Sequence, residues 1–415
     1  HKVREVGNNK MSIKKWFNKG VEFLKLVGYK LALKVVEKAI KKNPRYAEAW
    51  FGKGFILSEL GRYEEAIEAY EKAIEIKPQY LQAWFGKGDA LLSLGRYEDA
   101  LKAFDEAIQI DPQYALAWSH KGLALSSLGK YEDALKAHDK AIQIDPQYAG
   151  AWFTKGVALF RLERHQEAIE AFEKAIEINP QYTEAWFAKG ATLSGLNRYE
   201  DALKAYEKAI HINPQNAGAW FGKGVALLSL GRHQEALKAF EKAIEKNPQD
   251  AVDWFHRGVA LLSLGRHQEA LKAFEKVIEI YPKFTEAWFH RGVALSELGR
   301  YEEAIEACKK AIEINPQLAL AYTLLGDLYF KLGNLKEASE NIEKALKIDG
   351  KLISALSLQG RIKIEEKDYD AASESFKQAM TLYPSNPIHF LWYTYTNYLK
   401  AEFSLDSEDK KYQEE

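Results

Sequence analysis

A tryptophan recurs every 34 residues over most of this 415-residue chain, and a proline follows each of them at a constant offset of 28. A fixed period of this length is typical of stacked helical repeats, in which each repeat contacts only its neighbours. A repeat array grows in one dimension, so its length does not require several globular domains. We therefore expect function to lie in a surface that the repetition creates. The tryptophans are Trp16, Trp50, Trp84, Trp118, Trp152, Trp186, Trp220, Trp254 and Trp288.

One repeat can be taken as residues 47–80, and places are counted from its first residue. Trp50, Gly54 and Leu57 follow one another at spacings of four and three, which predicts one face of a first helix within 47–61. Glycine at place 8 lowers helix propensity by roughly 1 kcal/mol against alanine. We interpret this glycine as the point where the backbone of the second helix comes close.

A glycine at place 15 predicts the end of the first helix in a left-handed conformation, as at Gly61. Asn197 can take the same conformation in its repeat, whereas Glu163 cannot do so comfortably. The second helix is expected from about Tyr63 to Ile76 and ends before Pro78.

These residues fall on the signature positions of a known family. With Trp50, Tyr70, Ala73 and Pro78 at those places, the chain resembles a tetratricopeptide-repeat protein over residues 13–386. We number the repeats 1 to 11 in chain order. They start at residues 13, 47, 81, 115, 149, 183, 217, 251, 285, 319 and 353.

The resemblance implies an all-α fold: a right-handed α-solenoid of stacked helix-turn-helix units with a C-terminal capping helix. In this family the first helices line a concave groove. The expected layout is a basic N-terminal segment at 1–12, the repeats at 13–386, the capping helix at 387–402 and an acidic polar tail at 403–415.

The resemblance also assigns the concave wall to places 2, 5, 9, 12 and 13, which lie opposite the tryptophan on a helical wheel. Place 5 is a phenylalanine ladder interrupted by Ser119. Stacking could bury these rings against the adjacent first helix, or an exposed apolar stripe could receive a peptide or an amphipathic helix. The candidate binding residues are Phe51, Phe85, Asp89, Ser119, His120, Phe153, Arg161, Phe187, Phe221, Phe255 and Phe289.

Specificity must come from differences between nearly identical repeats, and we expect it at Asp89, Ser119, His120, Arg161 and Asn216. Some members of the family clamp a C-terminal carboxylate with lysine at place 5 and asparagine at place 9. This chain has phenylalanine at place 5, so the resemblance does not imply such a clamp.

A cation stands at place 7, where the family usually has leucine. Place 7 lies on the same side of the first helix as the tryptophan. We therefore expect the aliphatic stem of the cation to pack and its charged end to reach an acidic neighbour. A cationic row for an anionic polymer is the alternative. The cations are Lys19, Lys53, Lys87, Lys121, Lys155, Lys189, Lys223, Arg257 and Arg291.

Charge is distributed unevenly although the net charge is −1. Residues 1–50 hold 13 Lys or Arg against 4 Glu, and residues 401–415 hold 6 acids against 2 lysines. These ends are interpreted as solvated termini, with self-association or contact with nucleic acid or an anionic membrane through Lys14, Lys15, Lys41, Lys42 and Arg45 as alternatives. No signal peptide or membrane span is visible, which favours the cytoplasm, and a start at His1 suggests a fragment, a processed product or a tagged chain.

Catalytic chemistry finds no support in the sequence. The repeated Phe-Gly-Lys-Gly lies within a helix and lacks the strand and the ending of a phosphate loop. His256 and His290 share place 6 of adjacent repeats and could lie near each other, but no histidine has metal-ligand spacing. Cys308 is expected to be a buried, unreactive thiol. We expect no cofactor, no metal and no small-molecule substrate.

The function predicted from the sequence is a non-catalytic scaffold that binds a protein or peptide in the concave groove. The alternatives are a sensor or regulatory arm of a larger protein, and contact of the basic front with nucleic acid or a membrane.

Overall fold

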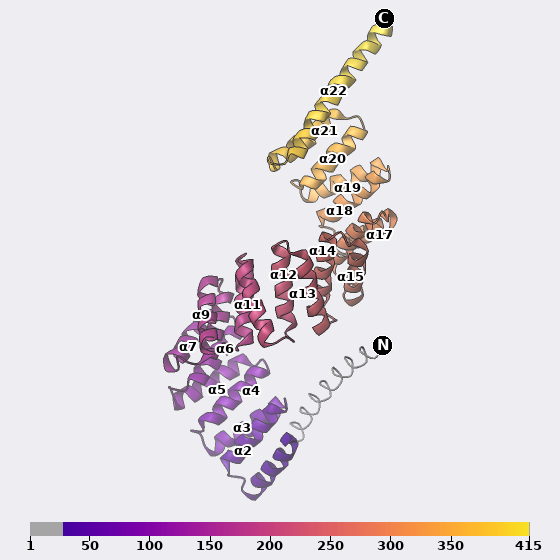
Figure 1. The fold of residues 1–415 in the computed structure, drawn as a ribbon. Coiled ribbons are helices and arrows are strands. Elements are labelled where there is room, and N and C mark those ends of the chain that lie inside the picture. The colour runs from indigo at the N-terminus through magenta and orange to yellow at the C-terminus, as the bar shows by residue number, and fades with distance from the viewer. Residues whose placement is uncertain (1–27, 415) are drawn as a thin grey trace, which may run out of the picture. The chain divides into compact units, whose positions relative to one another are not determined.

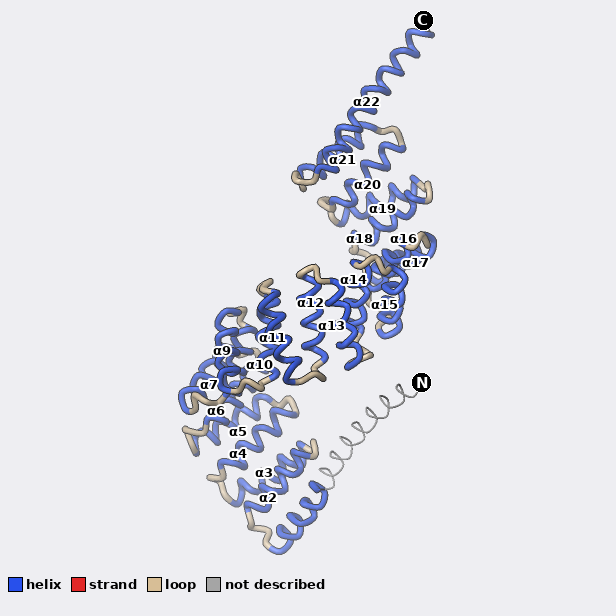
Figure 2. Tube along the Cα trace, in the orientation of Figure 1, coloured by secondary structure: helices blue, strands red, loops and turns tan. Residues whose placement is uncertain are grey.

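The structure is a computed structural model that describes residues 28–414, with side chains described up to residue 400. Every regular element in this part of the chain is an α-helix (Figure 2). Five residues named above lie outside the described residues: His1, Lys14, Lys15, Trp16 and Lys19.

The chain divides between Asn213 and Pro214 into two compact blocks. In the first block a helix at 28–42 is followed by the helix pairs of repeats 2 to 6 (Figure 1). The first helices of these repeats are α2 (Ala47–Glu59), α4 (Leu81–Ser93), α6 (Ala115–Ser127), α8 (Ala149–Arg161) and α10 (Thr183–Gly195). The second helices are α3 (Tyr63–Ile76), α5 (Tyr97–Ile110), α7 (Tyr131–Ile144), α9 (His165–Ile178) and α11 (Tyr199–Ile212).

The second block contains repeats 7 to 11 and a closing helix. Its first helices are α12 (Ala217–Ser229), α14 (Ala251–Ser263), α16 (Thr285–Glu297), α18 (Ala319–Lys331) and α20 (Ile353–Glu365). Its second helices are α13 (His233–Lys246), α15 (His267–Ile280), α17 (Tyr301–Ile314), α19 (Leu335–Ile348) and α21 (Tyr369–Leu382), followed by α22 (Pro387–Glu414). Within each block every helix packs on the one before it and the one after it, so the predicted all-α solenoid is confirmed.

A glycine facing an aromatic ring brings the two helices of a pair together. A Cβ atom added to Gly54 would lie 2.7 Å from the Tyr70 ring, and one added to Gly224 would lie 2.5 Å from the Phe240 ring. The rings at place 24 are therefore seated on the bare backbone of place 8. The expectation that the second-helix backbone makes this approach was wrong at these positions, because a ring side chain makes it.

The turn between the two helices of a repeat requires a left-handed residue at place 15. Gly61 has φ 72°, and the Arg62 N–H donates to the Leu57 carbonyl at 2.9 Å, which closes a Schellman motif. Glu163 has φ 60° in the same motif, although the sequence argued against this conformation for a glutamate. Lys367 also has a positive φ, 61°. The hydrogen bonds and packing of the turn set the conformation at place 15, and the side chain there adapts.

An indole hydrogen bond fixes the turn that precedes each of repeats 2 to 9, which accounts for the joint period of tryptophan and proline. The Nε1 of Trp84 donates to the Pro78 carbonyl at 2.9 Å, and the same bond joins Trp186 to Pro180 at 3.0 Å. Proline also ends the preceding helix because it has no N–H to donate.

The closing helix α22, which begins at Pro387, does not end at residue 402. It continues as one helix to Glu414, so residues 403–414 are helical in the structure. Trp392 packs on the last repeat, where its ring stacks on Phe376 with 5.8 Å between centroids. Phe390 and Leu391 are exposed.

The left-handed glutamate predicts a stabilising substitution. We expect Glu163→Gly to raise stability by about 1 kcal/mol, because an L-residue pays roughly 1–2 kcal/mol in this conformation and glycine does not. The midpoint of urea denaturation followed by circular dichroism measures the change. Glu163→Ala is the matched control, since alanine keeps the strain. An equal gain in both variants would show that backbone strain is not the cause.

Candidate functional site

The first helices line the inner side of each block. In the first block α2 contacts α4, α4 contacts α6, α6 contacts α8 and α8 contacts α10, and the second block repeats this from α12 to α20. Among the described helices, second helices are not paired with each other in this way. Because neighbouring elements lie closest on the inner side of a curved stack, each block has a concave face built by its first helices.

The phenylalanine ladder at place 5 is half-buried on this face. Except for Phe289, whose repeat has Cys308 at place 24, each ring packs on the ring at place 24 of its own repeat. In several repeats it also packs on the ring at place 34. Phe51 lies 5.9 Å from Tyr70 and 5.3 Å from Tyr80, measured between ring centroids. One part of each ring is therefore packed and the rest is accessible. The half-buried rings are Phe51, Phe85, Phe153, Phe187, Phe221, Phe255 and Phe289.

Aliphatic side chains border the ladder at places 9 and 12. Val225, Val259 and Val293 are half-buried, as are Leu228 and Leu262. In the first block, Phe55 and Phe160 expose 50% and 38% of their surface. The concave face thus carries an accessible apolar strip along the first helices of each block.

The cations at place 7 are engaged in packing, as predicted. The Lys87 ammonium lies 2.8 Å from a carboxylate oxygen of Glu71 in the preceding repeat and 5.5 Å from the centroid of the Trp84 ring. Arg257 makes the same two contacts with Glu241 and Trp254. These cations join neighbouring repeats, and the row does not lie free for an anionic polymer.

The comparisons with known proteins agree with this geometry. Family models described as tetratricopeptide repeat match residues 47–80, 120–183 and 353–386. The chain belongs to the tetratricopeptide repeat family. Another model, the C-terminal domain of cilia and flagella-associated protein 70, matches residues 153–351.

Several solved structures resemble the chain, and two of those named here are described as tetratricopeptide repeat proteins, YrrB and the protein from Parabacteroides merdae. A protein from Parabacteroides merdae is 20% identical, with 60% of this chain and 99% of that chain covered and a TM-score of 0.51. MamA is 30% identical, with coverage of 39% and 95% and a TM-score of 0.37. YrrB, described as having an unusual peptide-binding site, is 28% identical, with coverage of 45% and 96% and a TM-score of 0.41. No curated protein matches the chain. The tetratricopeptide repeats support a protein-interaction scaffold, and this fold is generally non-catalytic.

Repeat 4 interrupts the ladder between the phenylalanines of repeats 3 and 5. Ser119 is 1% exposed, so the residue that interrupts the ladder is not accessible to a ligand. The Tyr148 ring lies against Gly150, where an added Cβ would be 2.8 Å from it. Burial raises the pKa of the Tyr148 phenol, and a hydrogen bond with Ser119 opposes the shift. Tyr148 therefore occupies the place that a ladder ring would otherwise fill.

Asp89 and His120 form a polar pair on the concave face of the first block. His120 Nδ1 lies 3.0 Å from Asp89 Oδ1, and the two residues come from adjacent repeats. The His120 ring packs on Phe85 at 4.9 Å between centroids, and half of the Asp89 side chain is exposed. The pair gives this apolar strip one carboxylate that a ligand can reach.

His256 and His290 pack on ladder rings of the preceding repeat. The centroid of His256 lies 5.0 Å from that of Phe221, and His290 lies 5.1 Å from Phe255. Burial lowers the pKa of both histidines. They extend the aromatic surface of repeats 7 and 8.

Arg161 and Asn216, the remaining positions expected to set specificity, differ in role. Arg161 is exposed at the end of α8. The Asn216 side chain accepts a hydrogen bond from the Ala219 N–H at 3.0 Å and caps α12, so it has a structural role.

Two further departures from the repeat pattern are His138 and Asp253. His138 replaces an aromatic residue at place 24, and Asp253 replaces alanine at place 3. His138 is fully buried, its Nδ1 lies 3.2 Å from the Thr154 hydroxyl, and burial lowers its pKa to about 4. Asp253 is 4% exposed, and burial together with the charge of Asp250 raises its pKa to about 7. Comparing the repeats place by place would have found both.

Other site types find no support in the described part of the chain. There, no group of three or more histidine, cysteine, aspartate or glutamate side chains could hold a metal ion. No helix of that part is long and apolar enough to cross a membrane. Cys308 is buried as expected, and burial raises its thiol pKa to about 12.

The buried carboxyl of Asp253 predicts a pH-dependent stability. The pKa of this carboxyl is higher in the folded chain than in the unfolded chain. Its contribution to the stability of the fold is therefore favourable at low pH and is lost as the pH rises towards 7. Asp253→Ala should therefore stabilise more at pH 8 than at pH 5, by about 2 kcal/mol. Urea denaturation at the two pH values measures this, with exposed Glu297→Ala as the control. A gain that does not change with pH would contradict the assignment.

Proposed function

We propose that the chain binds an extended segment or an amphipathic helix of a partner protein on the concave face of its first helices. The observation that carries the proposal is the half-buried phenylalanine ladder. Clefts that bind peptides commonly offer apolar surface together with a few polar groups, and apolar surface left accessible in a row favours such a role.

Repeats 7 to 9 offer the most apolar part of this face. Phe221, Phe255 and Phe289 occupy place 5, and valine occupies place 9 in the same three repeats. Packed helices lie roughly 8–10 Å apart, and an extended chain covers this distance in about three residues. We therefore expect a ligand with apolar side chains about three residues apart if it is extended, or about seven apart if it is helical.

The polar pair of Asp89 and His120 in the first block adds a position that can select among ligands. The exposed carboxylate of Asp89 favours a cationic side chain or an N–H donor of the ligand, held near Phe85. Arg161 lies exposed near the same face and favours an acidic side chain. Such charged contacts supply orientation more than affinity.

Other functions remain as alternatives. A sensor or regulatory arm of a larger protein is compatible with the same groove. Contact with nucleic acid or an anionic membrane would use the basic front, of which Lys41, Lys42 and Arg45 are exposed in the described residues. Loss of binding with a steep salt dependence would support that alternative. Self-association through the apolar face also stays a prediction.

Selection from a random peptide library displayed on phage tests the groove directly. We expect the native chain to enrich peptides with spaced apolar residues, and Val225→Asp with Val259→Asp to weaken their binding at least roughly tenfold. These valines border the ladder without carrying its ring contacts. Binding is measured by fluorescence anisotropy, and circular dichroism confirms that the helices persist.

The matched control places the same two charges on the outer helices of the same repeats. Gln234 and Gln268 are exposed on α13 and α15, so Gln234→Asp with Gln268→Asp should leave peptide binding unchanged. Equal binding by the valine variant, or equal loss in the control, would reject the concave face as the binding surface.

A further inference from the structure

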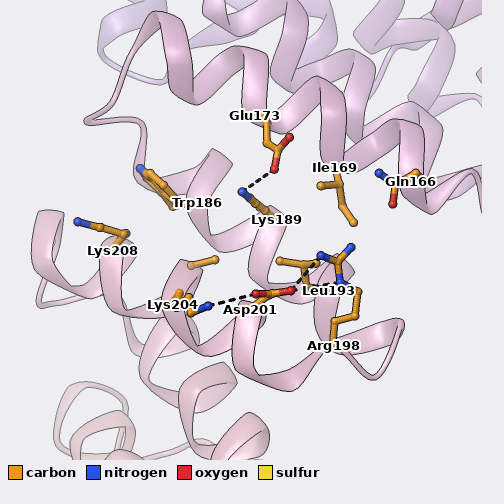
Figure 3. A pocket seen from close by; sticks show the side chains of 11 residues that line it. Gln166, Ile169, Glu173, Trp186, Lys189, Leu193, Arg198, Asp201, Lys204 and Lys208 are labelled. Carbon is orange, nitrogen blue, oxygen red and sulfur yellow. Dashed lines mark hydrogen bonds and ion pairs between the residues drawn. The ribbon is translucent and has the colours of Figure 1, made fainter.

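A hollow of about 410 Å³ lies where α9 of repeat 5 meets repeat 6, and no residue of the ladder lines it (Figure 3). Residues of α9, α10 and α11 line it. Buried Ile169 and Leu193 form its apolar floor, and the half-buried Trp186 ring stands at one end beside Lys208. The hollow therefore combines an apolar base with a polar rim.

Cations outnumber acids around this rim. Lys189, Arg198, Lys204 and Lys208 face only two carboxylates. Both carboxylates are already engaged, because Glu173 lies 2.7 Å from Lys189 and Asp201 lies 2.9 Å from Arg198 and 3.4 Å from Lys204. The rim is thus left with positive charge that the protein does not neutralise.

Equivalent hollows in other repeats have no excess of cations. Those beside Trp50 and Trp152 each combine two lysines with four glutamates, and the one beside Trp220 combines three lysines with three glutamates. At place 22, Lys204 stands where repeat 5 has Glu170. Of the four hollows compared, the one in repeat 6 is lined by more cations than acids, so this excess does not follow from the fold alone.

The lysine at place 26 shows the same departure. In repeat 5, Lys174 pairs with Glu177 at place 29, with 2.7 Å between nitrogen and oxygen. In repeat 6, His211 replaces that glutamate, so Lys208 has no carboxylate three residues ahead. No ion pair of Lys208 is found among the described residues. Its ammonium is available to an external acceptor.

We propose that this hollow binds an acidic side chain of a partner protein, together with an apolar side chain beside it in the sequence. The carboxylate meets Lys204 and Lys208, and the apolar group rests on Trp186 and Leu193. Placing a carboxylate between two lysines neutralises the rim, and the floor removes apolar surface of both partners from water.

A peptide fits this site better than a nucleic acid does. Exposed Glu170, Glu177 and Glu200 lie on the same two second helices as the lining residues. A nucleic-acid backbone carries closely spaced phosphates, which these glutamates would repel on either side of the hollow. One or two carboxylates can enter without meeting them.

The test uses the full chain and a fluorescein-labelled twelve-residue peptide in which pairs of glutamates alternate with leucine and phenylalanine. Fluorescence anisotropy is expected to show saturable binding. Lys204→Glu with Lys208→Glu, which gives repeat 6 the charges of an acidic hollow, should weaken it about tenfold. The matched control is Lys238→Glu with Lys242→Glu at the same places of repeat 7, which should change the affinity by less than twofold.

Three outcomes would overturn the proposal. Equal weakening by both double variants would show diffuse attraction to the net charge. Unchanged binding by the repeat 6 variant would place the peptide elsewhere. Tighter binding of a twelve-nucleotide single strand at the same lysines would identify a nucleic-acid site. The site is independent of the concave face, so Val225→Asp with Val259→Asp should not affect this peptide, and neither proposal depends on the success of the other.

Discussion

The seating of an aromatic ring on a glycine is the contact on which most of the repeats depend. At Gly224 no Cβ could be added without reaching within 2.5 Å of Phe240, so the two helices of the pair are held at a distance that only glycine permits. The same ring supports the ladder, because Phe221 lies 5.9 Å from Phe240 between centroids. The packed core therefore presents the ladder on the concave face. Where the ring is missing, as at Gly292, the smaller Cys308 Sγ fills the approach at 3.0 Å from an added Cβ.

Contacts between repeats leave the two faces of the solenoid with different chemistry. The indole of Trp186 bonds to the preceding turn, and Lys189 reaches back to Glu173, so tryptophan and cation both serve stacking. The concave face remains apolar, whereas ion pairs cover much of the outer face. On such a face a local imbalance matters more than the total charge, because the pairs elsewhere neutralise each other. Repeat 6 has this imbalance at Lys204 and Lys208.

The sequence predicted the regular helices well because the same residue types recur at the same places of each repeat. The second helix expected from Tyr63 to Ile76 has these bounds as α3. The sequence could not predict the turn at Glu163, because neighbouring hydrogen bonds decide that conformation. It could not predict the burial of Ser119 either, because the ring that covers this residue comes from Tyr148. A place-by-place comparison of the repeats would have identified His138 and Asp253 as unusual residues. The hollow at Trp186 was not, because its lining comes from three helices that only the packed structure brings together.

Access of solvent to the ladder tests the central claim most directly. Phe221 and Phe240 would each be replaced in separate samples by 4-fluorophenylalanine, and the ¹⁹F relaxation of each ring measured with a soluble gadolinium chelate. Phe221 is half-buried and Phe240 is fully buried, so the account predicts clear paramagnetic broadening of the first signal and little of the second. Equal protection of both rings would mean that the ladder is sealed inside the stack and that no apolar strip is available to a partner.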